Sequence, residues 1–107
     1  MTFKFTKEDK INELPAPIKA HFKNFLNNRI SQVESLEEAI EDEDFEEIRL
    51  FCHAQLGVAG SYKCHKLDEL TRYIQHHARK EQLRPIKEVI PTLKDYLQGL
   101  KLDKLDK

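Results

Sequence analysis

The sequence predicts an all-α protein, an antiparallel four-helix bundle with a short N-terminal extension. Apolar residues recur at steps of three and four in four successive segments, the spacing of one buried face of an amphipathic helix. The chain has 3 Gly, 4 Pro and no Trp, too few turn residues for a β-sandwich or barrel. Its 107 residues have the length of one domain, 1–107, of which about 16–100 form the bundle.

The first helix is predicted from Pro17 to about Asp42, with a bend near Asn27. Pro15 and Pro17 suit its entry and first turn, where a missing N–H has no helical partner. Its apolar stripe comprises Ile18, Phe22, Phe25, Leu26, Ile30, Val33, Leu36 and Ile40.

The second helix is predicted to begin after Asp44, which has a glutamate three residues later, as in a capping box. It ends at Gly60 and Ser61. Its buried stripe comprises Phe45, Ile48, Cys52, Leu56 and Ala59.

The third helix is predicted from about His65 to Lys80, and the fourth from Pro85 onward, with Pro91 inside it. The third turns Leu67, Leu70, Ile74 and His77 or Ala78 inward. The fourth buries Ile86, Ile90, Leu93, Leu97 and Leu100.

Both ends of the chain are predicted to be flexible. Residues 2–6 read either as a strand or as a disordered arm, and the polar repeat of residues 101–107 is expected to fray.

Charge and composition exclude several classes of protein. No apolar run approaches the roughly 18–20 residues of a membrane span. The 19 acids and 18 bases leave a net charge of −1, which does not predict nucleic acid as a partner. Two cysteines are too few for a disulfide framework, and no secretory leader pattern precedes them, so a cytoplasmic location is expected.

The charge is unevenly divided along the chain. Residues 1–61 hold 12 acids and 7 bases, a net of −5, and residues 62–107 hold 7 acids and 11 bases, a net of +4. The acidic run from Glu34 to Glu47 is typical of a solvated helix face and turn. The basic part of the chain begins at Lys63, shortly after the stretch that carries the candidate chemistry.

That stretch is residues 51–60, Phe-Cys-His-Ala-Gln-Leu-Gly-Val-Ala-Gly. On a helical wheel His53 falls about 100° from the centre of the buried stripe, so its ring is expected at the accessible edge, with Leu50 exposed beside it. Gly57 and Gly60 follow on the same side, and glycine within a helix costs up to about 1 kcal/mol relative to alanine. Either a partner approaches this backbone closely around a nucleophilic imidazole, or the histidine only packs and the glycines allow tight contact between helices.

These residues resemble the histidine-containing phosphotransfer (HPt) domains of two-component phosphorelays. The resemblance covers residues 16–100: Leu36-Glu-Glu-Ala39 leads to Asp44, and His53, Gly57 and Leu67 then fall at their expected places. It implies that His53 accepts a phosphoryl group, as a phosphocarrier and not a turnover enzyme. The implied partner is a response-regulator receiver domain or a hybrid histidine kinase, with Mg²⁺ on the receiver and no cofactor on this chain, which is expected to be a monomer.

Two positions depart from the family pattern. The lysine expected three residues after the histidine is Leu56 here, and the glycine expected ten residues after it is Lys63. Gln55, Lys63 and Lys66 are therefore candidates to lie near the phosphoryl group with Gly57. The partner is expected to dock on Arg49, Leu50, Gly57 and Gly60, with Gln55 beside them.

Two alternatives remain open. Without the lysine, the chain can be a degenerate HPt-like module that binds a receiver or another signalling partner and is not phosphorylated. The Cys52-His53 and Cys64-His65 pairs raise the question of zinc. However, Cys52 is predicted to face the core and His53 to lie at its edge, so this adjacent pair cannot easily bind one ion. No metal ligands are therefore predicted.

Overall fold

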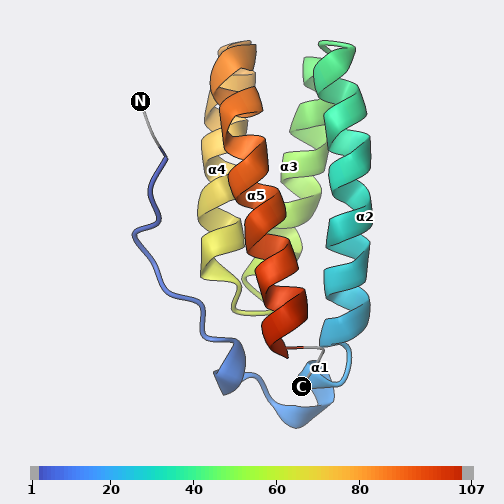
Figure 1. Ribbon diagram of the computed structural model, residues 1–107, viewed down its shortest axis with the longest axis vertical. Coiled ribbons are helices and arrows are strands. Elements are labelled where there is room, and N and C mark those ends of the chain that lie inside the picture. The colour runs from blue at the N-terminus through green and yellow to red at the C-terminus, as the bar shows by residue number, and fades with distance from the viewer. Residues whose placement is uncertain (1–2, 105–107) are drawn as a thin grey trace.

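Helices make up all the regular structure in the computed structural model, which describes residues 3–104, with side chains to Lys101 (Figure 1). The all-α class predicted from the sequence is therefore confirmed for this part of the chain. In chain order the elements are the 3₁₀ turn η1 (Ile11–Glu13), α1 (Ala16–Lys19), α2 (Phe22–Glu41), α3 (Phe45–Ala59), α4 (His65–Arg79) and α5 (Leu83–Lys104).

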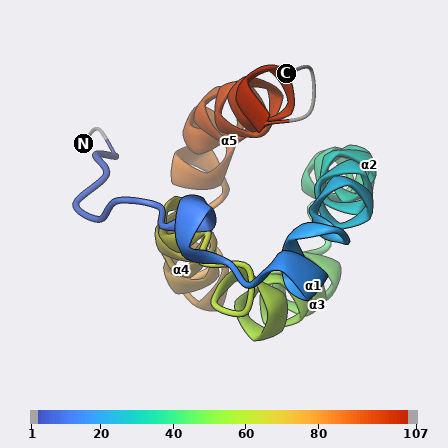
Figure 2. The ribbon, with the colours of Figure 1, turned by 90° about the horizontal axis from the view of Figure 1, so that it is seen from below.

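The four longer helices pack side by side in a ring (Figure 2). α2 contacts α3 and α5, and α4 contacts the same two helices from the other side. Each of the four runs opposite to the one before it (Figure 1). None of the helices in the described residues combines the length and the apolar content that crossing a membrane requires.

The three turns between these helices have the same construction. In each, an N–H bonds back to a carbonyl five residues earlier: Asp44 to Ala39, Cys64 to Ala59 and Gln82 to His77, at 2.9–3.0 Å. The residue before each donor has a positive φ, at Glu43 (53°), Lys63 (56°) and Glu81 (53°). This is the Schellman end of a helix, here built without its usual glycine.

The predicted limits of α3, α4 and α5 agree with the structure to within two residues. Asp44 caps α3 by accepting a bond from the N–H of Glu47 at 3.1 Å. α5 begins two residues before Pro85 and continues through Pro91. Burial of the predicted inward residues of α4 and α5 is also confirmed, and both His77 and Ala78 are buried.

The predicted first helix is wrong in its first turn. The chain breaks at Ala20 and His21, so residues 16–19 form the separate helix α1, and no break interrupts α2 near Asn27. Ile18 is 38% exposed and is not part of the buried stripe. Phe25, in the first turn of α2, is buried as predicted, and its ring stacks on Tyr62 with the centroids 4.1 Å apart.

The N-terminal arm packs against the bundle. Residues 3–10 form no strand, yet they lie against α4 and α5 (Figure 2). Phe5 packs on Tyr96 with ring centroids 5.9 Å apart, and the Tyr96 hydroxyl donates to Asp9 at 2.6 Å. The arm is therefore attached by aromatic packing and hydrogen bonds. At the other end α5 continues to Lys104, into the segment 101–107 that is predicted to fray, and residues 105–107 lie outside the described residues.

Candidate functional site

His53 lies in the middle of α3 with its side chain exposed, as the wheel predicted. Leu50, one turn before it, is 55% exposed, which also confirms the prediction. An apolar side chain with this exposure beside an accessible imidazole is a candidate contact for another protein. Next to Leu50, between α2 and α3, is a hollow of about 290 Å³, lined by Gln32, Ser35, Leu36, Ala39, Glu47, Leu50 and Phe51.

The glycines after His53 leave an open surface. No heavy atom of the described residues outside the local helix lies within 4 Å of a Cβ built at Gly57 or Gly60. The interpretation that these glycines allow helices to pack tightly is therefore wrong, because no neighbouring helix approaches them. What remains is a strip of bare helix backbone next to His53 that a second molecule can approach.

Gln55 does not lie on this surface, which corrects its predicted role near the phosphoryl group and in docking. Its side chain is 1% exposed and points toward α2, where Oε1 accepts a bond from Arg29 at 2.9 Å and Nε2 donates to Gln32 at 2.7 Å. Leu56, expected to be buried, is instead half-buried. The buried stripe of α3 is thus centred closer to Gln55 than the apolar residues alone indicate.

Arg49, one turn before His53, connects α3 to α4. Its Nη1 donates to the carbonyl oxygen of Ala78 at 3.3 Å, so this guanidinium is partly engaged within the molecule. α3 and α4 run antiparallel and pack together, so four residues forward in α3 correspond to about four residues back in α4. His53 is therefore level with about residues 71–75 of α4.

This register identifies two residues that the sequence analysis missed, Gln75 and Arg79. The side chains of Lys66 and Tyr73 face the N-terminal arm on one side of α4. On the α4 wheel Gln75 and Arg79 lie roughly opposite these two residues, so they lie on the side of α4 toward α3. Gln75 is half-buried and level with His53, and Arg79 is exposed one turn further. Only the antiparallel pairing of α3 and α4 could have revealed them, since they are more than twenty residues from His53.

The two lysines proposed to lie near His53 are placed elsewhere. Lys66 donates its N–H to Asp9 at 2.8 Å and holds its ammonium 5.3 Å from the centroid of the Phe5 ring, on the arm side of α4. Its predicted place near the phosphoryl group is wrong for that reason. Lys63 lies in the turn beyond the end of α3, and its carbonyl accepts from the N–H of Lys10 at 3.0 Å. Ala59, the last residue of α3, is already about 9 Å along the helix axis from His53, and Lys63 lies beyond it. Lys63 is therefore not a neighbour of His53.

The two cysteines are both buried free thiols. Burial raises the pKa of each thiol to about 12. Cys52 lies in the core while the adjacent His53 is exposed, so the two side chains of this pair point apart. The described residues contain no group of three or more His, Cys, Asp or Glu side chains that could hold a metal ion.

Comparisons with known protein families, with curated protein sequences and with solved structures each found no match to this chain.

Proposed function

We propose that this chain is an HPt-type phosphocarrier, an antiparallel four-helix bundle that accepts a phosphoryl group on His53 from a receiver domain in the cytoplasm. The observation that carries the proposal is the exposed imidazole in the middle of α3, flanked by exposed Leu50 and by the open backbone at Gly57 and Gly60. A nucleophile on a rigid helix, with room for a partner on both sides of it, suits transfer between two proteins.

In the transfer step, the lone pair of a neutral imidazole nitrogen of His53 attacks the phosphorus of the aspartyl phosphate in line. The N–P bond forms as the P–O bond to the aspartate breaks, and the carboxylate leaves. The transition state needs mainly positioning and charge stabilisation, for which the receiver supplies its Mg²⁺.

On the side of this chain, Arg79 and Gln75 are the groups that we assign to the phosphoryl oxygens. Arg79 carries the positive charge that Leu56 lacks, and Gln75 offers an amide donor at the level of His53. A guanidinium can hold two phosphoryl oxygens at once, which makes it a fitting replacement for the absent lysine.

Phosphate transfer tests the proposal directly. A phosphorylated receiver is incubated with the wild-type chain, with His53→Gln and with His76→Gln, which replaces another exposed histidine. The expected result is a base-stable, acid-labile label on the wild type and on His76→Gln, and none on His53→Gln. Label that persists in His53→Gln contradicts the proposal.

Leu56 favours a second candidate, a module that binds a receiver without accepting phosphate. Under this alternative no variant is labelled, yet the wild type binds the receiver. Binding is then lost when bulk is added at Gly57 and is retained in His53→Gln.

A further inference from the structure

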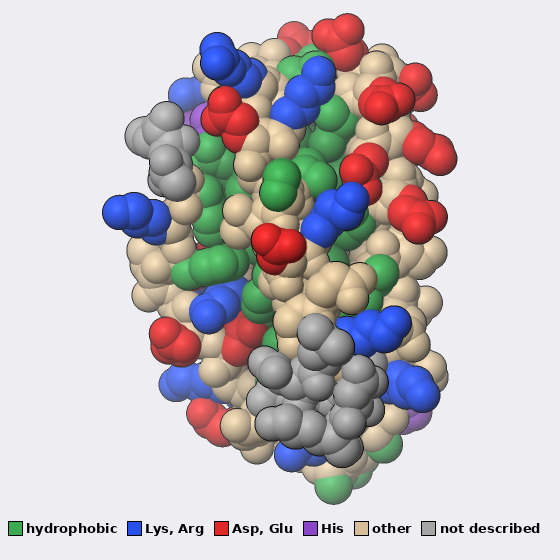
Figure 3. All heavy atoms as spheres, in the orientation of Figure 1, with side chains coloured by type: hydrophobic (Ala, Val, Ile, Leu, Met, Phe, Trp, Pro, Cys, Tyr) green, Lys and Arg blue, Asp and Glu red, His purple; other side chains and the backbone are tan. Residues whose placement is uncertain are grey.

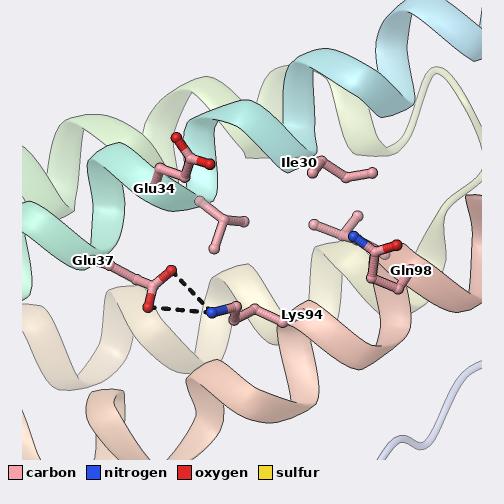
Figure 4. Close-up of a pocket in the computed structure, with 7 residues that line it drawn as sticks. Ile30, Glu34, Glu37, Lys94 and Gln98 are labelled. Carbon is pink, nitrogen blue, oxygen red and sulfur yellow. Dashed lines mark hydrogen bonds and ion pairs between the residues drawn. The ribbon is translucent and has the colours of Figure 1, made fainter.

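The face formed by α2 and α5, away from the surface around His53, carries two adjoining hollows with apolar floors (Figure 3). The first has a volume of about 220 Å³ and is shown in Figure 4; it is lined by Ile30, Val33, Glu34, Glu37, Lys94, Leu97 and Gln98. The second, of about 250 Å³, continues from it and is lined by Glu37, Ile40, Glu41, Lys87 and Ile90. We call this surface the α2–α5 groove.

The charges along the groove are separated by helix. The α2 rim is acidic, with Glu34, Glu37 and Glu41, and the α5 rim is basic, with Lys87 and Lys94 two turns apart. Glu37 and Lys94 face each other across the groove at 3.3 Å, with side chains 41% and 53% exposed (Figure 4). An ion pair this exposed contributes little stability by itself, and both groups keep free donor or acceptor capacity.

We propose that the α2–α5 groove binds the same groove of a second copy of this chain, by a two-fold axis that runs along the bundle. This operation places the α2 of each copy over the α5 of the other at the same level. Glu37 and Lys94 of both copies then form a square in which each charge has only opposite charges as nearest neighbours. Half-buried Ile30 becomes further covered at the same time.

The charge pattern excludes the other two-fold arrangement of the same faces. An axis across the helices would set α2 over α2 and α5 over α5, with acid against acid and base against base. Like charges directly opposed are destabilising. Because acidic residues lie on α2 and basic residues on α5, the groove is complementary to a second copy of itself in one orientation.

The contact is small, so the association is weak. The groove between Ile30 and Glu41 is about 18 Å long, and two packed helices are about 20 Å wide. The area that these two dimensions enclose is well below the roughly 800 Å² per partner that a standard protein–protein interface buries. The dimer is expected to form in the upper micromolar range, and its formation does not depend on phosphotransfer.

Sedimentation equilibrium tests the proposal with the whole chain, between about 10 μM and about 1 mM. The wild type should gain mass toward a dimer as its concentration rises. Lys87→Glu/Lys94→Glu makes both rims acidic, and Glu34→Lys/Glu37→Lys/Glu41→Lys makes both rims basic. Each variant alone should remain a monomer, and an equimolar mixture of the two should associate again.

The restored association in the mixture shows that both variants are folded, and far-ultraviolet circular dichroism checks each one alone. The matched control, Lys19→Glu/Lys80→Glu, changes the net charge as much as the acidic variant but at exposed positions outside the groove, and it should dimerise like the wild type. A wild-type chain that remains monomeric up to about 1 mM overturns the proposal. So does a mixture of the two groove variants that does not associate.

Discussion

Oε1 of Gln55 accepts a hydrogen bond of 2.9 Å from Nη1 of Arg29 in the interior between α2 and α3, only two residues along the chain from exposed His53. Burial lowers the pKa of Arg29, although Tyr62 opposes this in part. Among the described residues, Arg29 makes no ion pair and its buried Nε has no hydrogen-bond partner. The glutamine amide therefore satisfies a charge that has few other partners.

Replacing Gln55 by alanine should destabilise the fold by about 2–4 kcal/mol, because a partly buried guanidinium loses its acceptor. Urea unfolding followed by circular dichroism measures the change. The matched control is Arg29→Met/Gln55→Leu, which removes both polar groups and keeps their volume. It should recover most of the lost stability. A double variant as unstable as Gln55→Ala would show that the hydrogen bond is not the cause.

Arg79→Ala should slow phosphorylation of His53 while leaving the unfolding midpoint unchanged. A charge-assisted contact with a phosphoryl group is worth about 1.5 kcal/mol or more, so its loss should reduce the transfer rate about tenfold. Single-turnover transfer from a phosphorylated receiver gives the rate. Arg84→Ala, which removes an exposed arginine on α5, is the control and should transfer at the wild-type rate. Equal rates for both variants would remove Arg79 from the site.

Leu56→Lys restores the lysine that the family pattern places three residues after the histidine. Because Leu56 is half-buried and not fully buried, the new side chain can extend its ammonium to solvent, at a cost of about 1 kcal/mol. We expect the rate of phosphorylation to rise about tenfold. Leu56→Met controls for the lost packing and should leave the rate unchanged. A rate no higher than that of Leu56→Met would show that the missing lysine does not limit transfer.

The helices were predictable from the sequence because their apolar residues keep a regular period, and burial at α4 and α5 followed directly from that period. The conformations of the turns were less predictable from the sequence. Glu43, Lys63 and Glu81 adopt the left-handed conformation at which a glycine would have marked the end of each helix.

The site was predictable only within one helix. The positions of His53 and Leu50 follow from the wheel of α3, which needs no knowledge of the other helices. Gln55 was misplaced because a wheel built from apolar residues cannot anticipate that Arg29 holds a glutamine inside. The position of Gln75 beside His53 depends on the pairing of α3 with α4. The position of Lys66 away from His53 depends on the path of the N-terminal arm. Neither the pairing nor the path is a local property of the sequence.

Two substitutions at Gly57 should separate the stability of the bundle from docking. Gly57→Ala should stabilise the fold by about 0.5–1 kcal/mol, because the position lies inside a helix and a Cβ meets no described atom within 4 Å. Gly57→Arg should fold equally well but lose receiver binding, because its side chain fills the open strip beside His53. Thermal unfolding and titration calorimetry measure the two effects. Full receiver binding by Gly57→Arg would contradict the proposed surface.

The attachment of the N-terminal arm should weaken in acid because of Glu69. Burial raises the pKa of this carboxyl, but bonds from the Thr6 hydroxyl and N–H and the Lys7 N–H, at 2.6–3.1 Å, outweigh it and lower the pKa below its ordinary value. A carboxyl whose pKa is lower in the folded state stabilises the fold above the unfolded value of about 4.3. That stabilisation is lost as the pH falls through the folded value.

Amide hydrogen exchange at Thr6 and Lys7 should therefore show protection near neutral pH that is lost as the pH falls through the lowered pKa of Glu69, once the intrinsic exchange rates are corrected for pH. In Glu69→Gln the acceptor is uncharged at every pH, so protection should be weaker near neutrality and should no longer change in this range. The ring contacts of Phe3 with Tyr73 and of Phe5 with Tyr96 do not involve Glu69, and neither do the bonds that Asp9 accepts from Tyr96 and Lys66. These contacts therefore retain part of the attachment in both proteins. Protection in the wild type that does not change with pH would show that Glu69 does not hold the arm.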